Sequence, residues 1–109
     1  MIGPGDVERV LRRIVAFQDP EAVYVFGSYA KGTVKPSSDL DLVVVERTSL
    51  PRRMRGLDVQ GVLAEMPFDI DLIVVTPEEL AAEAADPWTL LGIVMPTARE
   101  LYRRAPATA

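Results

Sequence analysis

The sequence predicts a single small α/β (α+β) domain, in which helices pack against a small mixed β-sheet. The chain has 109 residues, a length that suits one domain with one hydrophobic core. Short apolar runs that are typical of buried strands alternate with segments of helical periodicity. About half of the residues are apolar (49%) and about a quarter are charged (26%), as in compact soluble proteins. We therefore expect one domain over residues 1–109.

The first helix is predicted from apolar residues at helical spacing, with Asp6 as its N-cap. Its apolar stripe consists of Val7, Val10, Leu11, Ile14 and Val15. The short run Ala22–Phe26 is β-branched and aromatic and ends at a glycine, so it predicts a buried strand. That strand delivers the chain into the segment Gly27–Gly32, for which we expect a helical turn.

The second strand is predicted over Asp39–Val45, after a polar loop at residues 35–38. Side chains alternate between the two faces of a strand. Asp39 and Asp41 therefore point to one face, and Leu40, Leu42 and Val44 point to the other.

A helix is expected to begin near Ser49 and Pro51, because proline is favoured at the first helical position. Its apolar stripe consists of Val59, Val62, Leu63 and Met66. The run Phe68–Val75 predicts the third strand.

The segment Thr76–Glu79 has the pattern of a capping box with proline at the first helical position, and it predicts a helix that ends near Ala85. Asp86 and Pro87 interrupt this pattern, and a short helix is expected around Trp88–Val94. The motif-bearing core spans about residues 5–85. A loose tail is expected to begin at about residue 103 to 105 and to run to Ala109.

Composition and charge exclude several classes of function. The chain has no cysteine and no histidine, so disulfides, thiolate nucleophiles and Ser-His-Asp triads are absent. The net charge of −4 argues against stable non-specific binding to DNA or RNA. No apolar run approaches the roughly 20 residues that span a bilayer, and the first residues have no signal-peptide pattern. We expect a cytoplasmic protein without a membrane anchor.

Four aspartates lie among the most apolar segments, where a carboxylate is costly to bury. The run from Asp39 to Val45 resembles the run from Asp69 to Val75 almost position for position. One explanation is that the aspartates are exposed strand ends. The other is that a divalent cation, with oxygen ligands, compensates the charges of Asp39, Asp41 and one of Asp69 or Asp71.

Gly27 and Ser28 follow a strand directly, and backbone N–H groups with a hydroxyl at such a turn commonly hold phosphate oxygens. A glycine-bounded turn after a strand is frequent and carries little weight alone. Combined with the downstream Ser38-Asp39-Leu40-Asp41 segment, it is much more specific.

These motifs, Gly27–Gly32, then Ser38–Leu42, then Asp71 in a third apolar strand, resemble the nucleotidyltransferase superfamily typified by DNA polymerase beta. The chain is most similar to the minimal nucleotidyltransferases, over about residues 5 to 80. The resemblance implies the polymerase beta-like nucleotidyltransferase fold.

The resemblance also implies roles for individual residues. Asp39, Asp41 and Asp71 would hold two Mg²⁺ ions, with Asp69 as the weaker alternative to Asp71. Gly27 and Ser28 would hold the phosphates of ATP or another nucleoside triphosphate. Family members often carry arginine where Lys31 stands. Lys31 is therefore either a phosphate contact or a solvated lysine.

The function that follows from the resemblance is transfer of a nucleoside monophosphate, AMP from ATP, to a hydroxyl acceptor. Small relatives of this kind are commonly paired with a HEPN-type partner protein, and some are antitoxins that modify a tyrosine on that partner. The alternative is an antitoxin or binding module that neutralises or scaffolds its partner by contact alone. The sequence leaves the acceptor, the nucleobase and any oligomer open.

Two further groups have two interpretations each. The basic cluster at Arg47, Arg52, Arg53 and Arg55 is either a solvated face or a contact for an acidic partner or RNA. Trp88, Leu101 and Tyr102 either pack against the domain or form a partner-binding patch.

Overall fold

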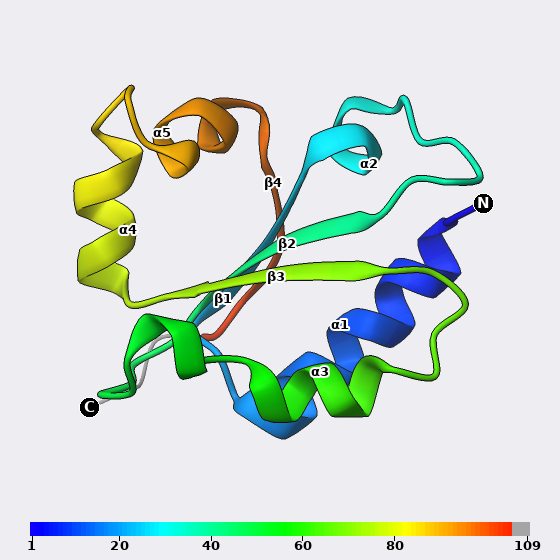
Figure 1. Ribbon diagram of the computed structural model, residues 1–109, viewed down its shortest axis with the longest axis horizontal. Helices are drawn as coiled ribbons and strands as arrows, with labels where there is room; N and C mark the ends of the chain where they lie inside the picture. Colours follow the sequence, from blue (N-terminus) through cyan, green and yellow to red (C-terminus); the bar gives the residue numbers. More distant parts are fainter. Residues whose placement is uncertain (106–109) are drawn as a thin grey trace.

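The computed structural model describes residues 1–105 as a four-stranded sheet with helices on both faces (Figure 1). The strand order is β3-β2-β1-β4. Strand β1 (Ala22–Phe26) pairs antiparallel with β2 (Leu40–Val45) and with β4 (Arg99–Arg103). Strand β3 (Ile70–Val75) pairs parallel with β2. The sheet is mixed, and the α/β fold class expected from the sequence is confirmed.

Two helices pack on each face of the sheet (Figure 1). Helices α1 (Pro4–Gln18) and α3 (Leu57–Leu63) cover one face, and α4 (Pro77–Ala84) and α5 (Leu90–Val94) cover the other. Three short elements complete the described chain: α2 at Gly27–Lys31, and the 3₁₀ turns η1 at Arg52–Met54 and η2 at Met95–Thr97. No helix in this part of the protein has the length and apolar character needed to cross a membrane.

Each face of the sheet has its own apolar core, and β2 contributes to both. Leu40, Leu42 and Val44 pack beneath α1 and α3, whereas Val43 and Val45 pack beneath α4 and α5. Because side chains alternate along a strand, a shift of one residue would exchange the two cores. The burial of both sets therefore fixes the register of β2.

The first helix begins earlier than the sequence analysis expects. Its N-cap is Gly3, and Pro4 occupies the first helical position. Asp6 lies in the first turn, where its carboxylate accepts a hydrogen bond of 2.9 Å from the Gly3 N–H. The assignment of Asp6 as N-cap is therefore wrong, because proline has no N–H to satisfy and starts the helix at its own position.

Several other boundaries also shift. Strands β2 and β3 begin at Leu40 and Ile70, so Asp39 and Asp69 lie just before the strands, and Asp41 and Asp71 lie within them. The helix expected from Ser49 and Pro51 is divided into η1 and α3 by Gly56, whose positive φ of 79° breaks the helical path. Helix α5 begins at Leu90 behind the N-cap Thr89 rather than at Trp88.

The sequence analysis does not predict β4, and it places the start of the tail too early. Arg103 ends this strand and donates a hydrogen bond of 2.7 Å to the Tyr24 hydroxyl. The Arg104 N–H donates to the Glu21 carbonyl at 2.8 Å. Residues 103 and 104 are therefore held against β1. The rest of the expected tail, residues 106–109, lies outside the described residues.

Three arginines of the predicted basic cluster are bound by acidic side chains of α4. Arg47 donates to Glu78, and Arg52 donates to Glu83. Arg55 donates to both oxygens of Glu79 and to the carbonyls of Leu50 and Val74, and its side chain is only 8% exposed. The cluster thus attaches the segment after β2 to α4.

The apolar residues near the end of the chain separate into two environments. Leu101 and Tyr102 are half-buried and pack against the core beneath α1 and α3. Trp88 is 92% exposed.

We predict that Arg55→Ala lowers the free energy of unfolding by about 2 kcal/mol, because it leaves the partly buried Glu79 carboxylate and Val74 carbonyl without their donor. The hydrogen bond from Arg55 lowers the pKa of Glu79 to about 2. Burial raises this pKa, but its effect is smaller. A carboxyl with a depressed pKa stabilises the fold above its unfolded pKa, and this contribution is lost as the pH falls toward 2. Urea titrations between pH 7 and pH 3 should therefore show a shallower acid dependence in the variant.

The control is Arg12→Ala, which removes an exposed ion pair with Glu8 on α1. It should change stability by less than about 0.5 kcal/mol. Equal effects of the two substitutions would show that the Arg55 contacts contribute no more than a surface pair.

Candidate active site

Four carboxylates gather where β2 and β3 begin. Asp41 lies directly opposite Asp71 in the parallel register. The Leu40 N–H donates to the Asp69 carbonyl at 2.9 Å, which extends the pairing by one residue and sets Asp39 beside Asp69. Alternation along the strands sends all four side chains to the face that carries α4 and α5. The sequence prediction that Asp39 and Asp41 share a face agrees with this geometry.

The Asp41 carboxyl is the most strongly perturbed acid of the group. Burial raises its pKa to about 6, and a hydrogen bond with Asp71 and the charges of Asp71 and Asp39 act in the same direction. The other three aspartates are exposed. A nearby cation would reverse this balance, because it favours the charged form of every carboxylate around it.

Gly27 lies against Asp41 and leaves no room for a side chain. Phe26, the last residue of β1, is paired with Asp41, and Gly27 follows with a φ of 72°. A Cβ at this position would lie 2.3 Å from the Asp41 Oδ2 atom. Two features therefore favour glycine at position 27: the left-handed backbone conformation and the close approach of the Asp41 carboxylate. The sequence suggested a phosphate-binding role for Gly27 and missed this steric one.

Helix α2 starts at Gly27 and ends at Gly32, whose φ is 73°. The Ser28 carbonyl accepts a hydrogen bond of 2.9 Å from the Thr33 N–H, which closes the turn. Ser28 is half-buried, and Lys31 is exposed in the last turn. The predicted helical turn after β1 is confirmed.

Arg99, at the start of β4, contacts the same turn. Its guanidinium lies 5.6 Å from the centre of the Tyr29 ring, within the range of a cation–π contact. Tyr29 also packs against the core beneath α1 and α3. Because β4 was not predicted from the sequence, the position of Arg99 beside this turn was not predicted either.

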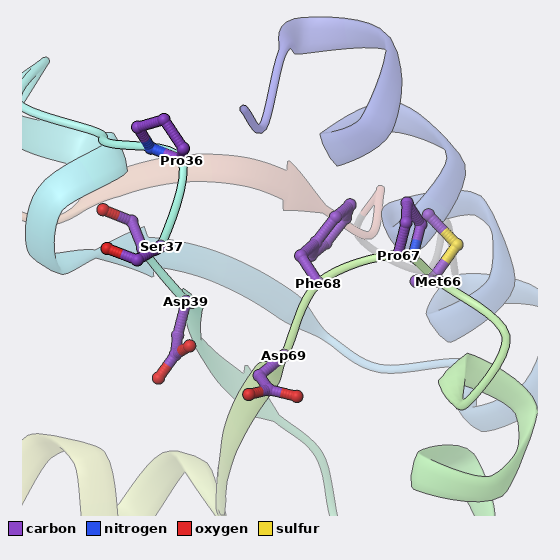
Figure 2. Close-up of a pocket in the computed structure, with 8 residues that line it drawn as sticks. Pro36, Ser37, Asp39, Met66, Pro67, Phe68 and Asp69 are labelled. Carbon is purple, nitrogen blue, oxygen red and sulfur yellow. The ribbon is translucent and has the colours of Figure 1, made fainter.

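Two adjoining pockets open beside the carboxylates. The first, of about 320 Å³, lies between the loop Pro36–Asp39 and the segment Met66–Asp69, with Asp39 and Asp69 side by side in it (Figure 2). The second, of about 350 Å³, has Asp39, Asp69 and Asp71 on its strand side. Its opposite side is formed by Gln60, Leu63 and Ala64 of the α3 segment. None of these α3 residues was predicted as a site residue, because none belongs to the sequence motifs that indicate the site.

The carboxylates fit a hard divalent cation by chemistry, since Mg²⁺ and Ca²⁺ prefer oxygen ligands. The carboxylates lie further apart than the ligands of a metal-bound site. Within residues 1–105, no three acidic side chains stand close enough to hold a metal ion without adjustment. The exposed positions of Asp39, Asp69 and Asp71 leave their side chains room to move toward an ion.

The site thus combines Asp39 and Asp41 at the start of β2, Asp71 on the parallel neighbour β3, and the Gly27-Ser28 turn that follows β1. The nucleotidyltransferase domain family matches residues 7–68, more than half of the 109-residue chain, and the chain belongs to this family. The matched segment contains Gly27, Ser28, Asp39 and Asp41. It ends before Asp69 and Asp71.

Three solved structures of toxin–antitoxin complexes share the fold. One was solved with AMP-PNP and has a TM-score of 0.60 and 20% identity, over 94% of this chain and 75% of that one. The second is an MntA-HpeT complex with a tyrosine replaced by alanine, with a TM-score of 0.57 and 20% identity over 95% and 75% of the two chains. The third is an MntA-HpeT complex with two aspartates replaced by glutamate, with a TM-score of 0.54 and 19% identity over 94% and 75%. No curated protein matches the chain.

We predict that Gly27→Ala destabilises the protein by roughly 2 kcal/mol, because it adds a clash with Asp41 to the cost of a left-handed alanine. Gly32→Ala is the matched control, since Gly32 has nearly the same φ but nothing within 4 Å of the added Cβ. It should cost about 1 kcal/mol. Urea unfolding measures both, and equal losses would contradict a steric requirement at Gly27.

We also predict that Asp41→Asn stabilises the metal-free protein at pH 8, by about 1 kcal/mol once solvent screening is allowed for. A carboxyl whose folded pKa is raised destabilises the fold above that pKa. The penalty is relieved as the pH falls through about 6 and is gone below the unfolded value of 3.8. The gain from the substitution should therefore shrink between pH 8 and pH 4 in thermal unfolding. A gain that is independent of pH would refute this explanation.

Proposed function

We propose that the protein transfers AMP from ATP to a hydroxyl acceptor in a Mg²⁺-dependent reaction. The observation that carries this proposal is the pairing of Asp41 with Asp71, beside Asp39, on adjoining parallel strands. Three carboxylates with no buried cationic partner are costly to keep together, unless a ligand compensates them. Membership of the nucleotidyltransferase domain family supports the same reaction class.

Each residue of the site has a distinct part in this proposal. Asp39, Asp41 and Asp71 would hold the metal ions, which supply positive charge to the entering and leaving oxygens when they are bound. The acceptor hydroxyl forms a new bond to the α-phosphorus as the bond to pyrophosphate breaks, and Asp71 accepts the hydroxyl proton. We favour Asp71 over Asp69 as the third ligand because its side chain contacts Asp41.

The turn after β1 would bind the terminal phosphates. Gly27 brings the start of α2 against Asp41, and the Ser28 hydroxyl with the neighbouring N–H groups would hold the phosphate oxygens there. Lys31, in the last turn of α2, would add a positive charge to this phosphate site.

We further propose that the acceptor is a tyrosine on a toxin-type protein partner, of the HEPN type. The similar solved proteins support this proposal, since they are toxin–antitoxin complexes, one with AMP-PNP and one with a tyrosine replaced. The same observation favours a second candidate function, an antitoxin that neutralises its partner by contact without catalysis.

The test is transfer of labelled AMP from ATP in the presence of Mg²⁺, with and without the partner encoded by the neighbouring gene. We expect label on the partner and release of pyrophosphate, and a loss of at least about 100-fold in the Asp39→Asn/Asp41→Asn variant. Asp71→Asn and Asp69→Asn distinguish the two candidate ligands, because only the true ligand should show a loss of that size. Partner binding that survives the double substitution, with no transfer by the wild-type protein, would establish the contact-only antitoxin instead.

A further inference from the structure

The groups proposed for catalysis follow one another across the sheet, from the turn after β1, through β2, to β3. Helix α2 follows β1 and contacts β1 and β2, and Gly27 lies against Asp41 on β2. Next comes β3 with Asp71, and β3 is an edge strand. Two adjoining pockets, which together we call the edge groove, lie at the start of β3. One opens between the loop before β2 and the segment before β3, and the other opens between β3 and the α3 segment. Its lining includes Ser37, Asp39, Ala64, Phe68, Asp69 and Asp71.

The direction of the proposed reaction assigns a role to the edge groove. In an in-line displacement, the attacking oxygen and the leaving oxygen lie on opposite sides of the phosphorus. If the leaving pyrophosphate lies on the α2 side of the carboxylates, the attacking hydroxyl arrives from the β3 side. The edge groove is the cavity on that side, and Asp71 forms part of its wall. We infer that the edge groove binds the acceptor, and that the acceptor hydroxyl belongs to a basic segment of a protein.

The charges around the site support the second half of this inference. Two cationic residues lie on the α2 side of the site. Lys31 is part of α2, and the Arg99 guanidinium lies over the ring of Tyr29, which is also in α2. The residues that line the edge groove, within the described part of the chain, include three aspartates and no lysine or arginine. Asp69 lies outside the proposed ligand set, so its charge remains when the ligands are occupied. Such a groove repels a polyanion such as an RNA end and attracts a cationic segment.

The walls of the edge groove also suit a side chain with an apolar body. Phe68, Pro67 and Met66 form one wall (Figure 2), and Met66 is buried in the core. The Gln60 amide donates to the Ile70 carbonyl at 3.3 Å, which ties α3 to the start of β3. The groove is therefore built on packed elements rather than on a free loop, as a specific binding site requires.

Single cysteines can test this assignment, because the chain has no cysteine of its own. Ala64→Cys places a thiol in the edge groove, and Ala85→Cys is its matched control. Both alanines are exposed and are the C-caps of their helices, α3 and α4. Lys31→Cys reports on the nucleotide side. The measurement is the rate at which maleimide modifies each thiol.

Mg²⁺ with AMP-PNP should slow modification of Lys31→Cys by at least about fivefold and leave Ala64→Cys and Ala85→Cys within about twofold. Three probes are then added to the nucleotide complex: a synthetic peptide with tyrosine between lysines, the same peptide with glutamates in place of the lysines, and an oligoribonucleotide with a free 3′ hydroxyl. The lysine peptide should slow modification of Ala64→Cys by at least about fivefold, and the other two probes should change it less than about twofold. Ala85→Cys should respond to none of them.

The outcomes separate this inference from the proposed function on which it rests. Protection of Ala64→Cys by the nucleotide would assign the edge groove to ATP and overturn the inference, while the proposed nucleotidyl transfer stands. Protection by the oligoribonucleotide, by both peptides equally or by no probe would overturn the assigned acceptor. Failure of the nucleotide to protect Lys31→Cys would contradict the proposal that ATP binds on the α2 side, and the inference about the edge groove would fail with it.

Discussion

The parallel pairing of β2 with β3 is the constraint on which the site depends. It sets Asp41 opposite Asp71, and every other feature of the site is arranged around that pair. The register is held by apolar residues further along the same strands, since Val43 and Val45 pack under α4 and α5 while Leu42 and Val44 pack under α1 and α3. A slip of one residue would move the aspartates into the opposite core. The hydrophobic core therefore positions the carboxylates.

This arrangement costs stability at the site. Asp41 is held where its charged form is disfavoured, and Gly27 adopts a backbone conformation that other residues rarely tolerate. Strain of this kind persists only where the surrounding structure determines it. Here the support comes from fully buried side chains on β1 and β2, among them Val25 and Leu40. The contacts of Arg55 and Glu79 add support at the other end of β3.

Local patterns in the sequence predict much of this structure. The strands β1, β2 and β3 and the capping box at Thr76 are short-range features, and the structure contains them with small shifts of boundary. Strand β4 was missed because Arg99–Arg103 does not alternate charged and apolar residues, and because its pairing with β1 spans most of the chain. The clash that excludes a side chain at Gly27 depends on contact with Asp41, which only the folded chain brings about. The edge groove was likewise hidden, since three separate segments form it.

The outer edge of β3 explains why a groove, rather than another strand, lies beside the carboxylates. An open edge strand presents unpaired backbone groups that can pair with a strand of another chain. In this protein the carbonyls of Ile70 and Val74 accept hydrogen bonds from Gln60 and Arg55. Both donors lie between β2 and β3 in the chain, so the connection that links the two aspartate-bearing strands also covers the exposed edge. The same connection forms the far wall of the edge groove through Ala64, which makes the proposed acceptor side of the site a consequence of how β3 is protected.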